Sequence, residues 1–142
     1  MGRRRPVIKT VFLDSSVLFT AVNSPTGGSA KLFTLQNLRL VTSTLVLTEV
    51  ERNIRGKLRS HFLERFFLLV ESLEIIDSIP TKQQIKAAQK IIVEKDAIIL
   101  ASGILSKADF IVSLDKKHFL TNLAEDYIKP QKIVTPKMLI NS

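Results

Sequence analysis

The sequence predicts an α/β protein, a three-layer α/β/α sandwich with a central, mainly parallel sheet. Two observations support this prediction. Short apolar runs rich in β-branched and aromatic residues alternate with longer segments whose apolar residues recur at helical spacing. In addition, residues 110–114 are apolar apart from Ser113, which is typical of a strand covered on both faces of a parallel sheet. Since no long linker separates the segments, residues 1–142 are expected to form one domain.

The composition is that of an ordinary globular protein, with 45% hydrophobic and 24% charged residues. No apolar run approaches the ~20 residues that cross a membrane, so no membrane association is expected. The chain has no cysteine, which excludes disulfides and thiolate metal sites and is compatible with the cytoplasm. Any metal must therefore be bound by oxygen ligands or by the two histidines, His61 and His118.

The chain is also strongly basic, with 21 Lys and Arg residues against 13 Asp and Glu residues and a net charge of +8. A polyanion such as nucleic acid is the natural partner for this charge. Because basic surfaces also serve solubility, charge alone supports nucleic-acid binding only weakly. Residues 1–6 (MGRRRP) are expected to form a flexible basic tail. They are not expected to begin a signal peptide, because Lys9 and Asp14 interrupt the apolar stretch that would have to follow.

The predicted elements follow from hydrophobic periodicity and from breaker residues. Strands are expected at residues 7–13, 39–42, 73–76 and 110–114, with a last one near 133–134. Helices are expected at residues 15–22, 29–38, 44–58, 61–73, 82–93 and 97–105, with a short one around 116–123. The helix from residue 61 is rich in Phe and Leu. Core packing is its ordinary interpretation, and a surface for a homodimer or another partner is the alternative.

Four acidic residues lie at the ends of these elements or beside their apolar faces: Asp14, Glu49, Asp96 and Asp115. Asp14 and Asp115 follow predicted strands, and open α/β sheets bind their ligands at the carboxyl ends of strands. The helix that begins near Asp96 runs antiparallel to the strand before Asp115, so its amino end returns to the same rim. The acids are therefore expected to lie together.

Four carboxylates at one rim repel one another in a low dielectric unless cations share the site. Mg²⁺ or Mn²⁺ is the expected cofactor, because these ions take hard oxygen ligands and leave positions for water and substrate phosphate. With two ions about 3.5–4 Å apart, one activates the attacking water and the other stabilises the leaving oxygen of an in-line displacement.

Each acid also has an ordinary structural interpretation. Asp14 and Asp96 are placed where a side chain caps a helix, and Glu49 resembles a helical surface residue. Asp115 resembles a turn residue ahead of Lys116. For the first three acids taken singly the structural interpretation is stronger, and for Asp115 the two are balanced. Four independent caps rarely fall in this order, so the joint pattern favours a site.

Other acid-based or phosphate-binding classes fit less well. A haloacid-dehalogenase-like phosphatase needs a second Asp two residues after the first, where this chain has Ser16. A response-regulator receiver needs an acid pair after its first strand and a phosphoacceptor Asp in mid-chain, and neither is evident. A Walker loop is absent, because Gly27 and Gly28 are not followed by Lys-Ser or Lys-Thr at the required spacing.

The motifs around the four acids resemble those of the PIN-domain nucleases, which include the toxins of VapBC-type toxin–antitoxin pairs. FLDSS contains Asp14 and TLVLTEV contains Glu49. KDA contains Asp96, and ADFIVSLD ends in Asp115, with Ser113 in place of the commoner Thr. The following KKHF is also similar to the family's pattern. The order and spacing of these motifs extend over nearly the whole chain.

The resemblance implies metal-dependent hydrolysis of RNA phosphodiester bonds. It implies that Asp14, Asp96 and Asp115 bind Mg²⁺ or Mn²⁺ with help from Glu49, which would also orient or deprotonate the attacking water. The alternative is a catalytically silent PIN-like module that binds RNA or protein. A small antitoxin that inserts a side chain into the acidic pocket would be the protein partner.

Further side chains are candidates to hold substrate phosphates: Ser16, Ser113, Arg52, Arg55, Lys116 and Lys117. Each has an ordinary interpretation as well, because serines after strands are commonly caps and single basic residues are usually solvated.

Overall fold

The computed structural model describes residues 7–141, so the basic tail predicted at residues 1–6 lies outside the described residues. Five strands form one sheet: β1 (Lys9–Leu13), β2 (Leu38–Ser43), β3 (Glu74–Ile76), β4 (Phe110–Val112) and β5 (Lys132–Val134). All four neighbouring pairs in this sheet are parallel, and the strand order is β3-β2-β1-β4-β5. The predicted α/β architecture is confirmed.

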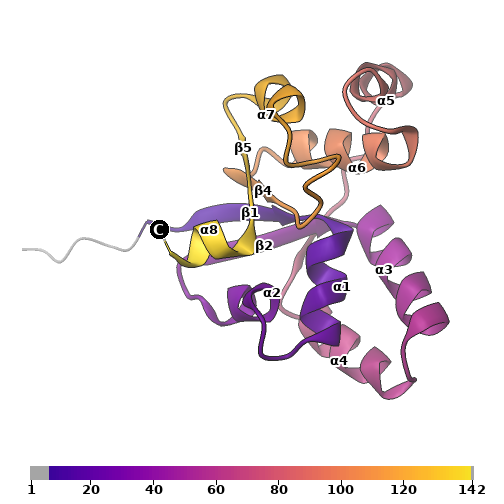
Figure 1. The fold of residues 1–142 in the computed structure, drawn as a ribbon, viewed down its shortest axis with the longest axis vertical. Coiled ribbons are helices and arrows are strands. Elements are labelled where there is room, and N and C mark those ends of the chain that lie inside the picture. The colour runs from indigo at the N-terminus through magenta and orange to yellow at the C-terminus, as the bar shows by residue number, and fades with distance from the viewer. Residues whose placement is uncertain (1–6, 142) are drawn as a thin grey trace, which may run out of the picture.

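Helices cover both faces of the sheet. They are α1 (Ser15–Asn23), α2 (Gly28–Lys31) followed by a 3₁₀ turn (Leu32–Thr34), α3 (Thr44–Lys57), α4 (His61–Val70), α5 (Lys82–Gln89), α6 (Glu94–Leu105), α7 (Asn122–Ile128) and α8 (Pro136–Ile140). Figure 1 shows α5, α6 and α7 on one side of the sheet and α1, α2, α3 and α4 on the other. This arrangement gives the three layers that the sequence predicts.

Consecutive side chains of the central strand β1 point into different layers. Val11 and Leu13 pack in one apolar cluster with Val112 of β4, whereas Phe12 packs in a second cluster with Ile111. These five side chains are fully buried. The alternation is the two-residue period of a strand, and burial on both sides explains why β1 and β4 are apolar almost throughout.

The strand order reverses beside β1. The chain runs from β1 to β2 and β3 on one side, and then crosses to β4 and β5 on the other side. A crevice forms at such a switch point, outside the carboxyl ends of the two strands that flank it. The pairing continues past the strand ends, because the backbone N–H of Asp14 donates to the carbonyl of Val112 at 3.0 Å. The residues that follow β1 and β4 are therefore neighbours.

Helix α6 packs closely against β1 and β4 through Gly103. A Cβ atom on Gly103 would lie only 2.7 Å from Cδ1 of Ile111 and 3.3 Å from Cδ1 of Phe12. A glycine at this position therefore allows the helix to approach the sheet, which fixes the height of α6 above the strands. The first turn of α6, which carries Asp96, is positioned by this contact.

The helix predicted at residues 29–38 is wrong in its second half. Regular α-helix ends at Lys31 and the 3₁₀ turn ends at Thr34. Leu38 already pairs with Lys9 in the sheet, and the Lys9 N–H donates to the carbonyl of Asn37 at 3.0 Å. Because the chain must be extended at that point, strand pairing overrides the local helical pattern.

The helix predicted around residues 116–123 is displaced toward the C-terminus. The carbonyl of Asp115 accepts hydrogen bonds from the N–H groups of Phe119 and Leu120, which close a turn. Helix α7 begins only after Thr121, whose hydroxyl caps it by accepting from the N–H of Ala124 at 3.1 Å. The cap residue, and not the apolar spacing, sets the start of this helix.

Helix α4 is only partly a core helix. Phe66 is buried, but Phe67 is 48% exposed and Leu68 is 65% exposed. The predicted core packing therefore applies to one face of α4, and two large apolar side chains lie on its surface. Between residues 7 and 141, no helix has both the length and the apolar character needed to cross a membrane.

Candidate metal centre

Asp14 stands at the carboxyl end of β1 and is 3% exposed. Its Oδ1 accepts a hydrogen bond from the N–H of Ser15 at 2.8 Å, so Asp14 does cap α1. Its Oδ2 accepts from the hydroxyls of Ser16 at 2.7 Å and Ser113 at 2.8 Å. Burial raises the pKa of Asp14, the three hydrogen bonds lower it, and the charge of Asp115 raises it, with a net upward shift.

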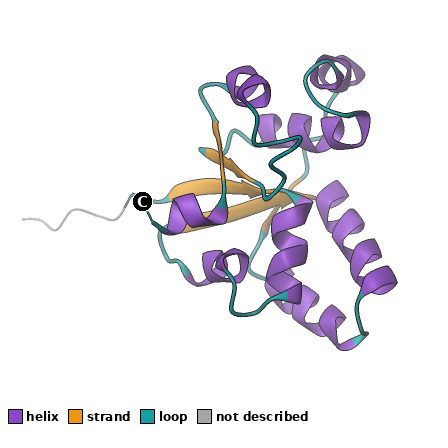
Figure 2. Cartoon of the chain, in the orientation of Figure 1, coloured by secondary structure: helices purple, strands orange, loops and turns teal. Residues whose placement is uncertain are grey.

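The two serines join the ends of β1 and β4. The Ser16 hydroxyl accepts from the N–H of Leu114 at 3.1 Å, and the Ser113 hydroxyl accepts from the N–H of Asp115 at 3.0 Å. Figure 2 shows the loop after β4 passing beside the start of α1, where these bonds lie. Each hydroxyl has one proton, and both protons are donated to Asp14. In this arrangement neither serine has a proton left for a phosphate.

Asp96 is not the helix cap that the sequence suggests. Helix α6 begins at Glu94, with Val93 in the cap position and no capping side chain. Asp96 lies in the first turn, where a negative charge is favoured by the helix dipole. Its side chain is 14% exposed, and its Oδ2 is buried without a hydrogen-bond partner.

The pKa of Asp96 is shifted by burial and by four charged residues around it. Burial raises the pKa of Asp96, and the nearby charges of Asp14 and Asp115 raise it further. Lys95 and His118 lower it, and the net shift is upward. Asp14, Asp96 and Asp115 therefore act on one another, as the sequence predicts for acids at one rim.

Asp115 follows β4 after Ser113 and Leu114, and not directly as predicted. Its Oδ1 accepts from the N–H groups of Lys117 and His118, both at 3.0 Å. Its Oδ2 lies 3.1 Å from Nδ1 of His118. The same Nδ1 lies 3.5 Å from Oδ2 of Asp96, so the imidazole stands between the two carboxylates.

This arrangement fits a divalent cation. One ligand atom from each of Asp96, Asp115 and His118 lies within 4.8 Å of the other two. The unpartnered Oδ2 of Asp96 is a buried acceptor that a cation would satisfy. Burial is the main cause that raises the pKa of Asp14 and Asp96, and the charge of a neighbouring carboxylate adds to it for both groups.

Glu49 does not join this group. It is half-buried on α3 and belongs to no metal-capable cluster within residues 7–141. Its charge does not shift the pKa of Asp14 or Asp96. Helix α3 nevertheless starts at the same edge of the sheet, because its cap residue Ser43 ends β2.

The basic candidates lie on exposed surface. Arg52 and Lys116 are exposed, and Arg55 pairs with Glu51 at 3.3 Å. The structure adds a basic candidate, Lys90, for which the sequence gave no signal. It lines a hollow of about 390 Å³ together with Lys117 and His118, and the rest of the lining is mainly apolar and includes Ile92 and Leu123.

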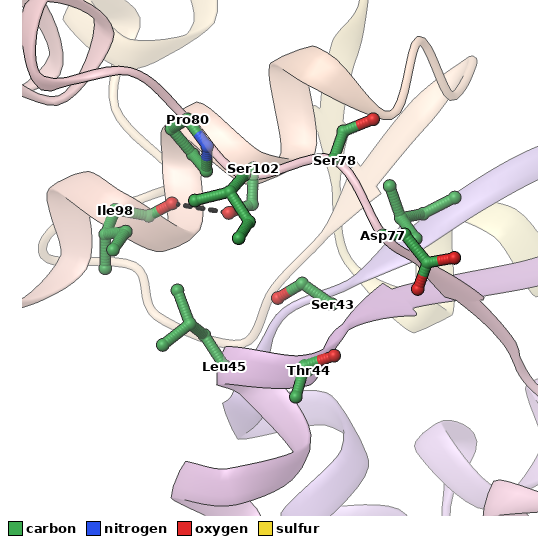
Figure 3. Close-up of a pocket in the computed structure, with 10 residues that line it drawn as sticks. Ser43, Thr44, Leu45, Asp77, Ser78, Pro80, Ile98 and Ser102 are labelled. Atoms are coloured by element: carbon green, nitrogen blue, oxygen red, sulfur yellow. Dashed lines mark hydrogen bonds between the residues drawn. The ribbon is translucent and has the colours of Figure 1, made fainter.

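A second cleft, of about 410 Å³, lies beside the carboxyl ends of β2 and β3. Figure 3 shows Leu45 of α3 and Ile98 of α6 facing this cleft, with Pro80 at its edge. The Ser102 hydroxyl is bonded to the carbonyl of Ile98 at 2.8 Å. The lining is mainly apolar, so this cleft offers binding surface but no cluster of catalytic groups.

A family model described as PIN domain matches residues 11–124. No curated protein matches the chain.

One similar solved structure is that of VapBC2 from Rickettsia felis, bound to a DNA fragment from the VapBC2 promoter. The TM-score is 0.69 and the identity is 19%, and the match covers 89% of this chain and 98% of that chain. PAE2754 from Pyrobaculum aerophilum has a TM-score of 0.66 and 12% identity, over 94% and 93% of the two chains. A toxin–antitoxin complex from Klebsiella pneumoniae has a TM-score of 0.61 and 18% identity, over 89% and 97%. At these identities the likeness shows the fold.

Proposed function

The chain belongs to the PIN-domain family, and from that premise we propose that it is a metal-dependent ribonuclease that hydrolyses RNA phosphodiester bonds. The observation that carries this proposal is the convergence of Asp96 and Asp115 at the switch point of the sheet, beside Asp14, which Ser113 links to Asp115 by hydrogen bonds. The family consists of nucleases, and a net charge of +8 on a chain with an acidic site suits a polyanionic substrate.

Asp96 and Asp115 are the carboxylates proposed to hold Mg²⁺ or Mn²⁺, because their oxygen atoms converge. Asp14 contributes its charge beside them. When bound, the ion supplies an activated water and neutralises the charge that develops on the phosphate. Ser16 and Ser113 are positioning residues in this proposal, since their hydrogen bonds hold the Asp14 carboxylate in one orientation.

Glu49 keeps its predicted role, which is to orient or deprotonate the attacking water. Two observations support this role: α3 begins at the same edge of the sheet, and the described residues form no ion pair with Glu49. A carboxylate that is not neutralised by a cation remains available to accept a proton.

Substrate phosphates are proposed to bind along the hollow that His118 lines, which is called the basic hollow here because two lysines line it. Lys90 and Lys117 line it, and Lys116 is adjacent in sequence. A lysine ammonium offers three donors on a flexible stem, which suits phosphate oxygens at several positions along a strand. Arg52 remains a candidate on the surface of α3.

A small antitoxin is the proposed protein partner. One similar structure is VapBC2 from Rickettsia felis, and another is a toxin–antitoxin complex from Klebsiella pneumoniae. The exposed Phe67 and Leu68 on α4 provide apolar surface that a partner could cover. A homodimer and a cytoplasmic location stay predictions from the sequence.

Digestion of RNA by the purified protein tests the proposal. Activity is expected to require Mg²⁺ or Mn²⁺, to stop with EDTA, and to be lost in Asp14→Asn and Asp96→Asn. Asp126→Asn is the matched control, because this acid is exposed on α7, away from the site residues, and pairs with Lys129 at 3.0 Å. Activity that survives EDTA, or that persists in both site variants, would remove the proposal.

The silent alternative predicts a different result. RNA would bind, with an affinity that falls as salt rises. No metal-dependent products would form at any protein concentration.

A further inference from the structure

The imidazole of His118 is held among the proposed metal ligands by the turn that follows β4. The backbone N–H of His118 donates to Oδ1 of Asp115 at 3.0 Å, which fixes the residue relative to that carboxylate. Its Nδ1 lies 3.1 Å from Oδ2 of Asp115 and 3.5 Å from Oδ2 of Asp96. Within residues 7–141, these three residues form the one group of His, Cys, Asp or Glu side chains close enough to share a metal ion.

One ring proton does not satisfy both carboxylates. Nδ1 carries at most one hydrogen, and the contact with Asp115 at 3.1 Å is the shorter one. Oδ2 of Asp96 is left buried without a hydrogen-bond partner. If Nδ1 carries no hydrogen, its lone pair faces two carboxylate oxygens. A cation between the three atoms satisfies all of them, and a buried unsatisfied acceptor is costly without one.

We infer that Nδ1 of His118 is a ligand of the bound metal beside Asp96 and Asp115, and that this nitrogen makes the site favour Mn²⁺ over Mg²⁺. The inference rests on the proposed metal-dependent function. Mg²⁺ takes oxygen ligands and keeps its waters, whereas first-row transition ions also accept imidazole nitrogen. The side chain of His118 is 24% exposed, so water and substrate can reach this end of the site.

Pulsed electron paramagnetic resonance on Mn²⁺ bound to the full chain tests the inference directly. Imidazole nitrogen bonded to Mn²⁺ produces a ¹⁴N modulation of the spin echo, which oxygen ligands do not give. The chain has only two histidines, which makes the assignment clear. The modulation is expected in the wild type, absent in His118→Gln, and retained in His61→Gln, whose histidine is exposed at the start of α4.

The outcomes separate this inference from the proposed function. Mn²⁺ that binds to the wild type without a ¹⁴N modulation overturns the ligand role of His118 and leaves the metal site standing. A modulation that persists in His118→Gln also overturns it. Failure of Mn²⁺ to bind to the wild type overturns the metal site and the inference together.

Calorimetric titration with each metal ion gives a second readout. Loss of the nitrogen ligand in His118→Gln is expected to weaken Mn²⁺ binding by about 10–100-fold, the range seen when groups that support a metal site are removed. Mg²⁺ binding is expected to change by much less. An equal loss for both ions would show that His118 only orients Asp115, and would overturn the proposal.

His118→Asn is the second variant, in case glutamine disturbs the turn. Its amide oxygen reaches about as far as Nδ1 and keeps an oxygen ligand in that place. This variant is expected to bind Mg²⁺ at least as well as the wild type and to give no imidazole modulation. Circular dichroism of each metal-free variant confirms that it is folded before titration. Weakened Mg²⁺ binding in a folded His118→Asn protein would count against the proposal.

Discussion

The hydroxyl of Ser113 donates to the carboxylate of Asp14 at 2.8 Å, and this bond joins residues 99 positions apart in the chain. It lies across β1 and β4, where the order of the strands reverses. The same hydroxyl accepts from the N–H of Asp115, so one small side chain holds two of the acids. The site is thus built into the ends of the central strands.

Replacing Ser113 with alanine is expected to destabilise the protein. The change removes a donor to the buried Asp14 and leaves the N–H of Asp115 without its acceptor, which costs about 1–3 kcal/mol for a buried polar group. Urea denaturation of the metal-free protein measures the loss. Ser72→Ala, at an exposed residue, is the control and should leave the midpoint unchanged. Equal midpoints for Ser113→Ala and the wild type would contradict this role.

The stability of the metal-free protein should depend on pH through Asp14 and Asp96. Burial and neighbouring carboxylates raise the pKa of both groups above 3.8, so the folded state holds these protons more tightly than the unfolded chain. The contribution of these two groups to the free energy of unfolding is therefore largest below about pH 3.8. It decreases as the pH rises through the pKa values of the folded state.

Asp96→Asn isolates this effect, because asparagine resembles the protonated carboxyl. In EDTA at pH 7, the variant is expected to unfold at a higher temperature than the wild type, and the difference should shrink as pH falls toward 3.8. For a chain of this length, 1 kcal/mol corresponds to roughly 4 °C in Tm. A difference that does not change with pH would contradict the predicted linkage. Added Mn²⁺ should stabilise only the wild type.

Removing the lysines of the basic hollow is expected to weaken RNA binding. Lys90→Gln and Lys117→Gln each delete one charge beside the acids, and each should reduce the salt dependence of log K for single-stranded RNA by about 0.7. Binding is measured in the Asp14→Asn background, in which RNA is not cut. Lys82→Gln, at an exposed lysine of α5 outside the hollow, is the control. Identical salt slopes in all three variants would place the RNA elsewhere.

The sequence predicts that Asp14 and Asp115 lie near the carboxyl ends of strands, because strand ends are marked by local patterns. Each of these two acids follows an apolar run, and this pattern indicates the rim of a parallel sheet. The distances between them could not be predicted. They depend on the strand order, which brings β4 beside β1 across the chain.

Local signals were less reliable for the helices around the site. Asp96 is a residue type that often caps helices, but α6 already begins at Glu94. The side chain of Asp96 therefore does not cap the helix and lies in its first turn. Helix α8 was missed although Thr135 and Pro136 are a capping residue and a first-turn proline. The sequence names His118 as a possible metal ligand but does not place it beside the acids, because its position depends on a turn that Asp115 closes through its carbonyl and carboxylate oxygens.

The close approach of α6 to the sheet yields a paired prediction at two glycines. Gly103→Ala adds a Cβ that would lie 2.7 Å from Cδ1 of Ile111, so the helix or the strand must shift, and overpacking of this kind costs about 1–3 kcal/mol. Gly56→Ala places its Cβ where no atom lies within 4 Å. It should stabilise α3 by up to about 1 kcal/mol, because alanine loses less backbone freedom in a helix.

The two glycine variants also test how the site is positioned. A shift of α6 moves Asp96 relative to Asp115, so Gly103→Ala is expected to weaken Mn²⁺ binding as well as lower the Tm. Gly56→Ala should leave Mn²⁺ affinity unchanged, since Gly56 lies near the far end of α3. Thermal denaturation and metal titration of both variants measure the two effects. A destabilised Gly103→Ala protein with wild-type Mn²⁺ affinity would show that the packing of α6 supports the fold without setting the geometry of the acids.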